Sequence, residues 1–357
     1  MQIDYLVIGQ GICGTFLSYE LLKTGKKVLV IDEAQPFSST KVASGVINPV
    51  TGRQVVTTWM AEELMPFTLN AYTAISNEIQ QPIIQSSPIQ AFPPSEQMRE
   101  AYEQKMTGTP AFIQPIAEAT IEEYNNYFHF FHGAVAIQPA WLIDLHSLLK
   151  GWRHRLTQQN ALLEESFDAT QLQIEANSIS YKHIQAEKIF FCNGVNTFQY
   201  SLWQNLPYSF NKGEALIADI PALPANRIYK FGISTLVPWY DGLWWVGSTY
   251  DNRFEDALPT DLFRQKKTAE LASVLKCNFT IVDHIASIRP ATVERRPFVG
   301  LHPAHPSVGI LNGMGTKGCS LAPYFAQQLA QHVVNNSAIA PAANVNRFAT
   351  TLSLQPK

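Results

Sequence analysis

The sequence predicts an α/β protein of mixed α+β character, in which a layered parallel sheet is joined to an antiparallel sheet. Residues 1–33 alternate as strand, glycine-rich turn, helix, turn and strand. Residues 207–285 hold short, aromatic-rich segments with strand-like alternation. Residues 82–131 follow neither pattern and are interpreted as inserted material. A chain of 357 residues can form one large unit or two closely joined domains.

The N-terminal pattern predicts a parallel βαβ unit. Residues 5–8 and 28–31 are unbroken apolar runs, as in strands that are covered by helices on both faces. Residues 11–22 between them have the apolar spacing of a helix, and a helical connection of this kind joins parallel strands.

The rest of the chain supplies further elements of both kinds. Helices are predicted at residues 96–104, 121–124, 141–156 and 322–334. Strands are predicted at residues 172–175, 179–181, 188–192, 214–218, 235–238 and 243–248. The last three strands are expected to form the antiparallel sheet and to wall a substrate cavity.

The composition excludes several kinds of partner and site. A net charge of −3 disfavours binding to nucleic acid, and no stretch is apolar for long enough to cross a membrane. No signal peptide is recognised, so a cytoplasmic location is expected. The four cysteines lie far apart without a CxxC pair, which disfavours zinc ribbons and disulfides. His302 and His305 lie in HPAHP, where prolines prevent helical pairing of ligands, and no metal is expected.

A dinucleotide-binding turn is predicted between the first strand and the first helix. Gly9, Gly11 and Gly14 form GxGxxG, and Asp32 ends the second strand. The glycines allow a tight turn, close approach of a pyrophosphate and close packing of the helix. The carboxylate of the acid accepts hydrogen bonds from the ribose hydroxyls. Glu33 is the alternative acid if the strand ends one residue later. A glycine turn that only packs a helix on the sheet would leave Asp32 unexplained.

The motif does not separate NAD from FAD, but longer segments do. The chain contains GQGICG, VLVID, SSTKVASGVINPVTGR, FFCNG, LVPWYDGLWWVGST, SIRPATVERRPFVG and NGMGTKGCSLAP in this order. In these segments it resembles the D-amino-acid oxidase and glycine oxidase family of FAD enzymes. The resemblance implies a Rossmann-like FAD-binding domain of the glutathione-reductase type and an antiparallel substrate domain. The FAD-binding domain is assigned to residues 1–82, 137–206 and 286–357, and the substrate domain to residues 83–136 and 207–285.

The resemblance also implies which residues contact FAD. They are the residues of the glycine motif with Ile12 and Cys13, then Asp32 or Glu33, Ser38, Ser39, Lys41, Ala43, Ser44, Gly45, Phe167, Cys192, Asn193, Gly194, Arg289, Gly313, Met314, Gly315, Thr316 and Lys317. Three alternatives stay open: a surface loop for residues 38–45, core packing for Phe167, and a solvated lysine at Lys317. Relatives can attach FAD through a Cys near the arginine motif or a His in the early loop. Neither residue occurs there, so noncovalent FAD is expected.

Arg289 is the main substrate candidate, because it matches the family's arginine for a substrate carboxylate and a guanidinium suits that anion. A salt bridge near Glu294 or a backbone clamp is the alternative. Lys317 and Tyr250 are further catalytic candidates, and Arg53 and Tyr240 are weaker ones.

The implied reaction moves a hydride from the carbon next to an amine nitrogen to flavin N5, with a small amine or amino acid as substrate. GMGTKGCSLAP is also similar to the oxidase that acts on a secondary amine of a modified wobble uridine in transfer RNA. A noncatalytic FAD-binding protein and an NAD-binding sensor are the alternatives from another class. Oxygen and a quinone both stay open as the final electron acceptor.

Overall fold

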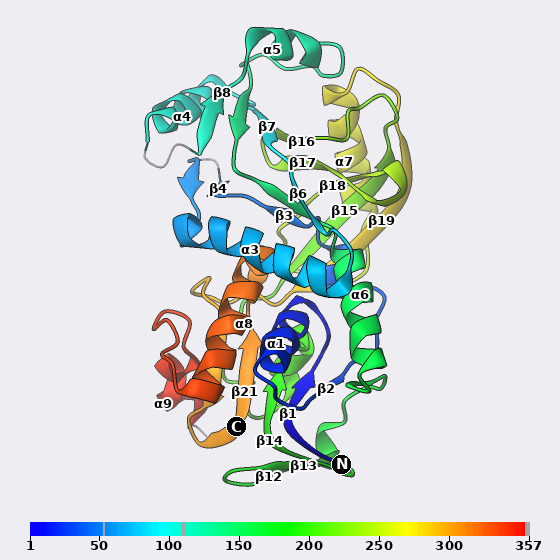
Figure 1. Cartoon of the computed structure of the whole chain (residues 1–357). Helices are drawn as coiled ribbons and strands as arrows, with labels where there is room; N and C mark the ends of the chain where they lie inside the picture. Colours follow the sequence, from blue (N-terminus) through cyan, green and yellow to red (C-terminus); the bar gives the residue numbers. More distant parts are fainter. Residues whose placement is uncertain (53, 109–111, 354–357) are drawn as a thin grey trace.

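The computed structural model describes residues 1–52, 54–108 and 112–353 and has two lobes (Figure 1). The lower lobe holds one large sheet, which includes the first strand of the chain, and the upper lobe holds a second large sheet. Helix α3 (Ala61–Ile79) crosses the molecule between them.

The sheet of the lower lobe is built on parallel strands. Its parallel part follows the order β11 (Leu162–Leu163), β2 (Val28–Ile31), β1 (Gln2–Ile8), β14 (Ile184–Phe191) and β21 (His305–Asn312). Antiparallel strands complete it, namely β20 (Phe298–His302), β13 (Ile179–Tyr181) and β12 (Leu172–Ile174). The predicted βαβ unit is present, because β1 and β2 are parallel neighbours joined by α1 (Ile12–Lys23).

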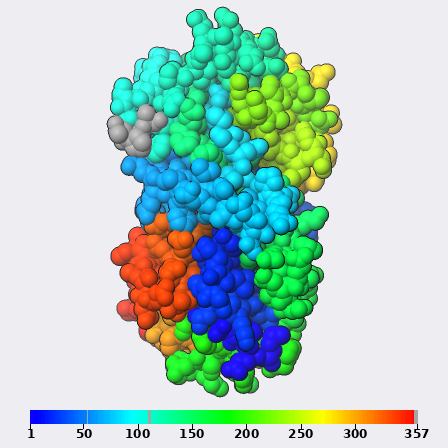
Figure 2. Space-filling view, viewed as in Figure 1, coloured from blue at the N-terminus to red at the C-terminus, as the bar shows by residue number. Residues whose placement is uncertain are grey.

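Helices cover one face of this sheet. Figure 2 shows α1 in dark blue between α8 (Gly318–Asn335) in orange and α6 (Leu145–Gln158) in green. Phe16, Tyr72, Trp152 and Leu329 from α1, α3, α6 and α8 are buried together in one core cluster. The opposite face packs against η2 (Gly194–Gln199), η5 (Val345–Phe348) and α9 (Ala349–Leu352). Apolar residues therefore line both faces, as their unbroken runs predict.

The upper lobe contains an eight-stranded, mainly antiparallel sheet. Its order is β19 (Thr280–Arg289), β15 (Asn211–Asp219), β18 (Trp244–Gly247), β17 (Ser234–Pro238), β16 (Ile228–Phe231), β7 (Ile89–Phe92), β9 (Val135–Ile137) and β8 (Ile113–Pro115). Strands from residues 83–136 and 207–285 thus pair in one sheet, and β9 and β19 extend slightly beyond these segments. The domain boundaries themselves stay a prediction.

Shorter elements connect the lobes and cover the upper sheet. They are β3 (Val46–Ile47), β10 (Trp141–Ile143) and β6 (Ile84–Ser86) in a three-stranded sheet, β4 (Val50–Thr51) and β5 (Val56–Thr57) in a hairpin, α2 (Ser39–Val42), α4 (Glu96–Met106), α5 (Glu118–Tyr124), η1 (Ala169–Gln171), η3 (Tyr240–Gly242) and η4 (Gly315–Lys317). Among the described residues, no helix is long and apolar enough to cross a membrane.

One local prediction was wrong, and one helix was not predicted. The helix expected from residue 141 begins at Leu145, because Trp141–Ile143 pairs as a strand with β3 and β6. The Asp144 carboxylate accepts a hydrogen bond from Ser147 N at 2.9 Å and so caps the helix start. Helix α7 (Asp261–Val274) lies within the region expected to contain strands, with Thr260 as its N-cap.

Candidate dinucleotide and substrate site

Close backbone packing explains the glycines of the turn between β1 and α1. Gly9 has a φ of +93°, and a Cβ atom there would lie 2.7 Å from Asn193 Cα. A Cβ atom on Gly14 would lie 1.8 Å from Gly9 O, so the first turn of α1 packs directly on the glycine turn. Thr40 also reaches this turn, since its Oγ1 accepts a hydrogen bond from Ile12 N at 3.1 Å.

Asp32 occupies the position expected for the ribose-binding acid. Its Oδ2 accepts a hydrogen bond from Gln10 N at 2.7 Å, and its Oδ1 accepts one from Ala34 N at 2.8 Å. Arg153 of α6 donates to the same Oδ1 at 2.8 Å and to Gln10 Oε1 at 2.9 Å. Glu33 is exposed and contacts Gln35 instead. The geometry therefore favours Asp32 over Glu33.

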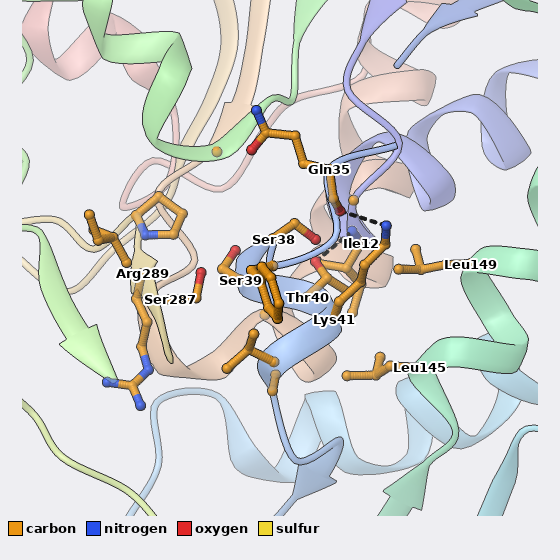
Figure 3. Close-up of a pocket in the computed structure, with 18 of the residues that line it drawn as sticks. Ile12, Gln35, Ser38, Ser39, Thr40, Lys41, Leu145, Leu149, Ser287 and Arg289 are labelled. Atoms are coloured by element: carbon orange, nitrogen blue, oxygen red, sulfur yellow. Dashed lines mark hydrogen bonds between the residues drawn. The ribbon is translucent and has the colours of Figure 1, made fainter. Parts of the chain in front are cut away.

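The segment after Asp32 folds inward over a cavity. Lys41 Nζ donates hydrogen bonds to Ala34 O at 3.1 Å and to Gln35 O at 2.6 Å, which closes the loop on itself. Figure 3 shows Ser38, Ser39 and Lys41 around the cavity, with Leu145 and Leu149 of α6 on one side and Arg289 on the other. A free surface loop does not describe this segment.

The cavity has a volume of about 730 Å³, within the usual range for small-molecule sites. Predicted residues that line it are Gly9, Gly11, Ile12, Cys13, Asp32, Glu33, Ser38, Ser39, Lys41, Ala43, Ser44, Cys192, Asn193, Gly194, Arg289, Met314, Gly315 and Thr316. Predicted residues outside its lining are Gly14, Gly45, Phe167, Gly313, Lys317 and Tyr250. Gln10, Thr40 and Arg153 line it without having been predicted.

The residues outside the lining have other surroundings. Gly45 packs against the backbone, since a Cβ atom there would lie 2.2 Å from Ile143 O. A Cβ atom on Gly313 would lie 2.6 Å from Thr292 Cγ2. The ring of Phe167 stacks on Tyr181 with centroids 4.9 Å apart, which supports the core-packing alternative for this residue.

Arg289 is the last residue of β19, and neutral groups hold its guanidinium. Nη1 donates to Asn211 Oδ1 at 2.8 Å and to Thr249 O at 3.0 Å, and Nη2 donates to Ser248 Oγ at 3.0 Å. The guanidinium lies over Gly213, where a Cβ atom would come within 1.9 Å of Nη2. The other amide atom of Asn211, Nδ2, is buried and finds no acceptor in the described parts of the chain.

No carboxylate pairs with Arg289 among residues 1–52, 54–108 and 112–353. Glu294 pairs with Arg347 at 3.1 Å, so the expected alternative of a salt bridge to Glu294 is not what the structure shows. Burial lowers the pKa of Arg289, but an arginine stays charged at every physiological pH. The cavity therefore ends at an uncompensated positive charge.

Lys317 lies at the start of α8, with its Nζ 2.8 Å from Asn48 Oδ1. Burial, with a smaller effect of the charge of Lys230, lowers the pKa of Lys317 to about 8. A freely solvated lysine does not fit this environment. The burial of Cys319 raises the pKa of its thiol to about 12, so this neighbour stays neutral.

The tyrosine candidates differ in position. Tyr240 stacks on His146 with ring centroids 4.0 Å apart, and its hydroxyl accepts a hydrogen bond from His146 N at 3.1 Å. It therefore joins η3 to the start of α6. Tyr250 is 55% exposed. Arg53 lies outside the described residues.

Burial keeps His302 and the four cysteines uncharged. Burial lowers the pKa of His302 to about 4, so His302 is neutral beside His305. No cluster of three or more potential metal ligands occurs in the described ranges of the chain. All four cysteines are free thiols, and burial raises the pKa of Cys13 to about 12.

The two-lobed fold and the cavity that begins at the glycine turn define a dinucleotide-binding protein of the flavoprotein type. A family model described as FAD dependent oxidoreductase (DAO) matches residues 4–332, and the chain belongs to this family. The predicted family, fold class and FAD cofactor are thereby confirmed.

Individual relatives are similar over different lengths. The uncharacterized oxidoreductase YurR of Bacillus subtilis is 41% identical over 46 residues, which are 13% of this chain and 12% of YurR. Glycine oxidase from Geobacillus kaustophilus has a TM-score of 0.78 and 17% identity, covering 95% of this chain and 96% of that chain. L-proline dehydrogenase from P. horikoshii has a TM-score of 0.76 and 18% identity, covering 98% of both chains. At these identities the two structures show a common fold.

Proposed function

We propose that this protein is an FAD-dependent amine or amino-acid oxidase or dehydrogenase that works in the cytoplasm on a small substrate carrying a carboxylate. The observation that carries the proposal is Arg289, whose guanidinium lies partly buried at the wall of the cavity without an acid partner in the described chain. An uncompensated buried charge is costly unless a ligand supplies the opposite charge. A substrate carboxylate is such a ligand.

The residues at the other end of the cavity fit noncovalent FAD. Gly9 and Gly14 let α1 pack closely on the turn, and the missing side chain at Gly11, the second glycine of the motif, lets the backbone approach a pyrophosphate. The start of α1 favours an anion, and Asp32 Oδ2 keeps acceptor capacity for a ribose hydroxyl. When bound, FAD supplies the hydride acceptor for oxidation of the amine.

The protein's own part in the reaction is to orient the substrate. Arg289 would bind the carboxylate through its guanidinium, which Asn211 Oδ1 holds in orientation. A fixed carboxylate also fixes the neighbouring carbon and nitrogen, and such positioning can supply much of the rate acceleration. No protein nucleophile is required.

The test is the visible spectrum of the holoprotein under anaerobic conditions, before and after addition of glycine, sarcosine, proline or D-amino acids. Bleaching of the flavin by any of these carboxylate-bearing amines supports the proposal. A flavin spectrum that none of them changes, but that transfer RNA perturbs, would favour the wobble-uridine alternative. An unchanged spectrum with every amine and with RNA would favour a noncatalytic FAD-binding protein.

A further inference from the structure

Asp32 and Arg153 form an ion pair on the wall of the cavity. Arg153 Nη1 lies 2.8 Å from Asp32 Oδ1, and both residues line the cavity. The Asp32 side chain is 20% exposed and the Arg153 side chain is 19% exposed, so the pair is largely buried and still reaches the cavity. Arg153 Nη2 also donates to the backbone O of Asp32 at 3.2 Å. The arginine therefore holds both the carboxylate and the main chain of Asp32.

Arg153 is itself held by the glycine turn and by its own helix. Its Nη1 donates a second hydrogen bond to Gln10 Oε1 at 2.9 Å. Gln10 is buried, and its Nε2 donates to Leu149 O of α6 at 2.9 Å. Arg153 Nε donates to Glu164 Oε1 at 3.3 Å. The position of the guanidinium is thus fixed from several sides.

These hydrogen bonds decide which oxygen of Asp32 can serve a ligand. Each carboxylate oxygen can accept about two hydrogen bonds. Asp32 Oδ1 accepts two, from Ala34 N at 2.8 Å and from Arg153 Nη1 at 2.8 Å. Asp32 Oδ2 accepts one, from Gln10 N at 2.7 Å, and keeps capacity for one more. A hydroxyl group in the cavity would therefore bind at Oδ2, in an orientation that Arg153 helps to set.

Arg153 also balances the charge of Asp32. Gln10, whose N binds the carboxylate, lies between the first two glycines of the motif, so Asp32 is beside the turn where a pyrophosphate binds. Two anions at close range repel each other. The pair of Asp32 and Arg153 carries no net charge, which reduces this repulsion. An acid can thus bind ribose next to a pyrophosphate at a smaller cost in free energy.

We infer that Arg153 is a positioning residue for the cofactor, which orients Asp32 so that Oδ2 accepts the 2′-hydroxyl of the adenosine ribose of FAD. Arg153 acts through Asp32. The inference concerns the cofactor, so it does not depend on which substrate the protein oxidises. A role of Arg153 in holding α6 on the sheet alone would instead affect every ligand of the cavity alike.

The test compares FAD with 2′-deoxy-FAD, in which the adenosine lacks the 2′-hydroxyl. Dissociation constants of both ligands are measured by flavin fluorescence during reconstitution of the apoprotein. We expect wild type to bind FAD about tenfold more tightly, as the loss of one hydrogen bond to a charged group implies. Arg153→Met should remove most of this preference. Arg153→Lys should keep part of it, because a lysine can still donate to Oδ1.

A double-mutant cycle tests whether Arg153 acts through Asp32. Asp32→Asn should itself weaken the preference for FAD over the analogue. Adding Arg153→Met to Asp32→Asn should then change the preference little, because residues that act as a unit are not additive. Independent losses that add in the double variant would contradict the positioning role.

Arg155→Met is the matched control on the same helix. Arg155 forms an ion pair with Glu78 at 2.8 Å and lies outside the lining of the cavity. It should keep the wild-type preference, and the thermal midpoints of all variants report their folding. If Arg153→Met does not fold, Arg153→Gln replaces it, because glutamine removes the charge and stays polar, and it should show the same loss.

Equal affinities of wild type for the two ligands would overturn the inference, because Asp32 would then not bind the 2′-hydroxyl. A preference that survives in the Arg153 variants, or an equal loss in Arg155→Met, would overturn it as well. Amines that bleach the flavin of a protein without this preference would leave the proposed function intact. A chain that binds neither FAD nor the analogue would reject both.

Discussion

Arg289 shows how a side chain can be fixed in place without being neutralised. Three neutral acceptors, on Asn211, Thr249 and Ser248, hold its two terminal nitrogens. Hydrogen bonds to a charged group are stronger than neutral ones, so the fork is oriented while its charge remains available. The absence of a Cβ atom at Gly213 gives the guanidinium its space.

Replacement of Arg289 tests the role of its planar guanidinium. Arg289→Lys keeps the charge but loses the planar fork, so kcat/KM for a carboxylate substrate should fall by about 10–100-fold, as loss of a charge-assisted hydrogen bond implies. Steady-state kinetics against substrates with and without a carboxylate measure this. The thermal midpoint of the holoprotein serves as the control for folding, and an equal loss for both kinds of substrate would contradict the assignment.

Lys317 should make anion binding dependent on pH. Its pKa is lowered to about 8 by burial, so it is charged below that pH and neutral above it. Cys319, whose pKa is raised to about 12, and the amide of Asn48 do not titrate in this range. The neighbouring residues Thr316 and Gly318 line the cavity, so affinity for a carboxylate ligand bound there should fall as pH rises through about 8.

The measurement is a series of flavin titrations between about pH 6.5 and about pH 9.5, below the ordinary pKa of lysine. Lys317→Arg should flatten the profile, because arginine remains charged throughout. A wild-type profile that is itself flat, or a fall that persists in Lys317→Arg, would assign the titration to another group.

At the scale of elements, the glycine turn depends on contacts between backbones. The first turn of α1 lies directly on Gly9, and Asn193 at the end of β14 lies on its other side. Larger residues would push α1 away from the sheet and from the site expected for the pyrophosphate. Folding of this element and binding of the cofactor are therefore coupled.

Gly14→Ala should separate α1 from this turn. The added Cβ atom would lie 1.8 Å from Gly9 O, and overpacking of this kind costs about 1–3 kcal/mol. We expect lower cofactor content and a lower free energy of unfolding, measured by flavin absorbance and urea denaturation. Gly25→Asn is the control, because asparagine tolerates a positive φ and no atom lies within 4 Å of that Cβ position. Equal effects of both changes would contradict the packing argument.

At the scale of the whole molecule, one cavity joins segments that are distant in the sequence. The residues that line it fall within the segments 9–13, 32–44, 145–153, 192–196, 213–215, 245–257, 287–290 and 312–319. A cofactor in this cavity would contact most of them at once. Its binding should therefore stabilise both lobes together.

Removal of the cofactor should lower the thermal stability of the entire chain. Linkage gives about 2.7 kcal/mol of stabilisation at a ligand concentration one hundred times the dissociation constant. Differential scanning calorimetry of apoprotein and reconstituted holoprotein would show a single transition that moves to higher temperature with added FAD. Two separate transitions, of which only one responds to FAD, would show that the lobes unfold independently.

Sequence patterns predicted the parts of this molecule that depend on neighbours in the chain. The spacing of Gly9, Gly11, Gly14 and Asp32 is local, and so is the apolar pattern of β1, α1 and β2. Arg153 lies 121 residues from Asp32, and its role needs the packing of α6. Strand β10 is three residues long, and only its pairing with β3 and β6 distinguishes it from a helical turn. The apolar pattern of the sequence therefore predicted a helix that includes these three residues.

The order of strands in the lower sheet has a consequence for synthesis. Strand β1 lies at the start of the chain and ends at Ile8, and it pairs with β14. Strand β14 pairs in turn with β21, which ends at Asn312 near the other end of the chain. These long-range pairings must wait until most of the chain has left the ribosome, and such contacts form slowly. Nascent N-terminal fragments therefore expose apolar strands for a long period and are natural clients of chaperones, and flavin can be captured only after translation is nearly finished.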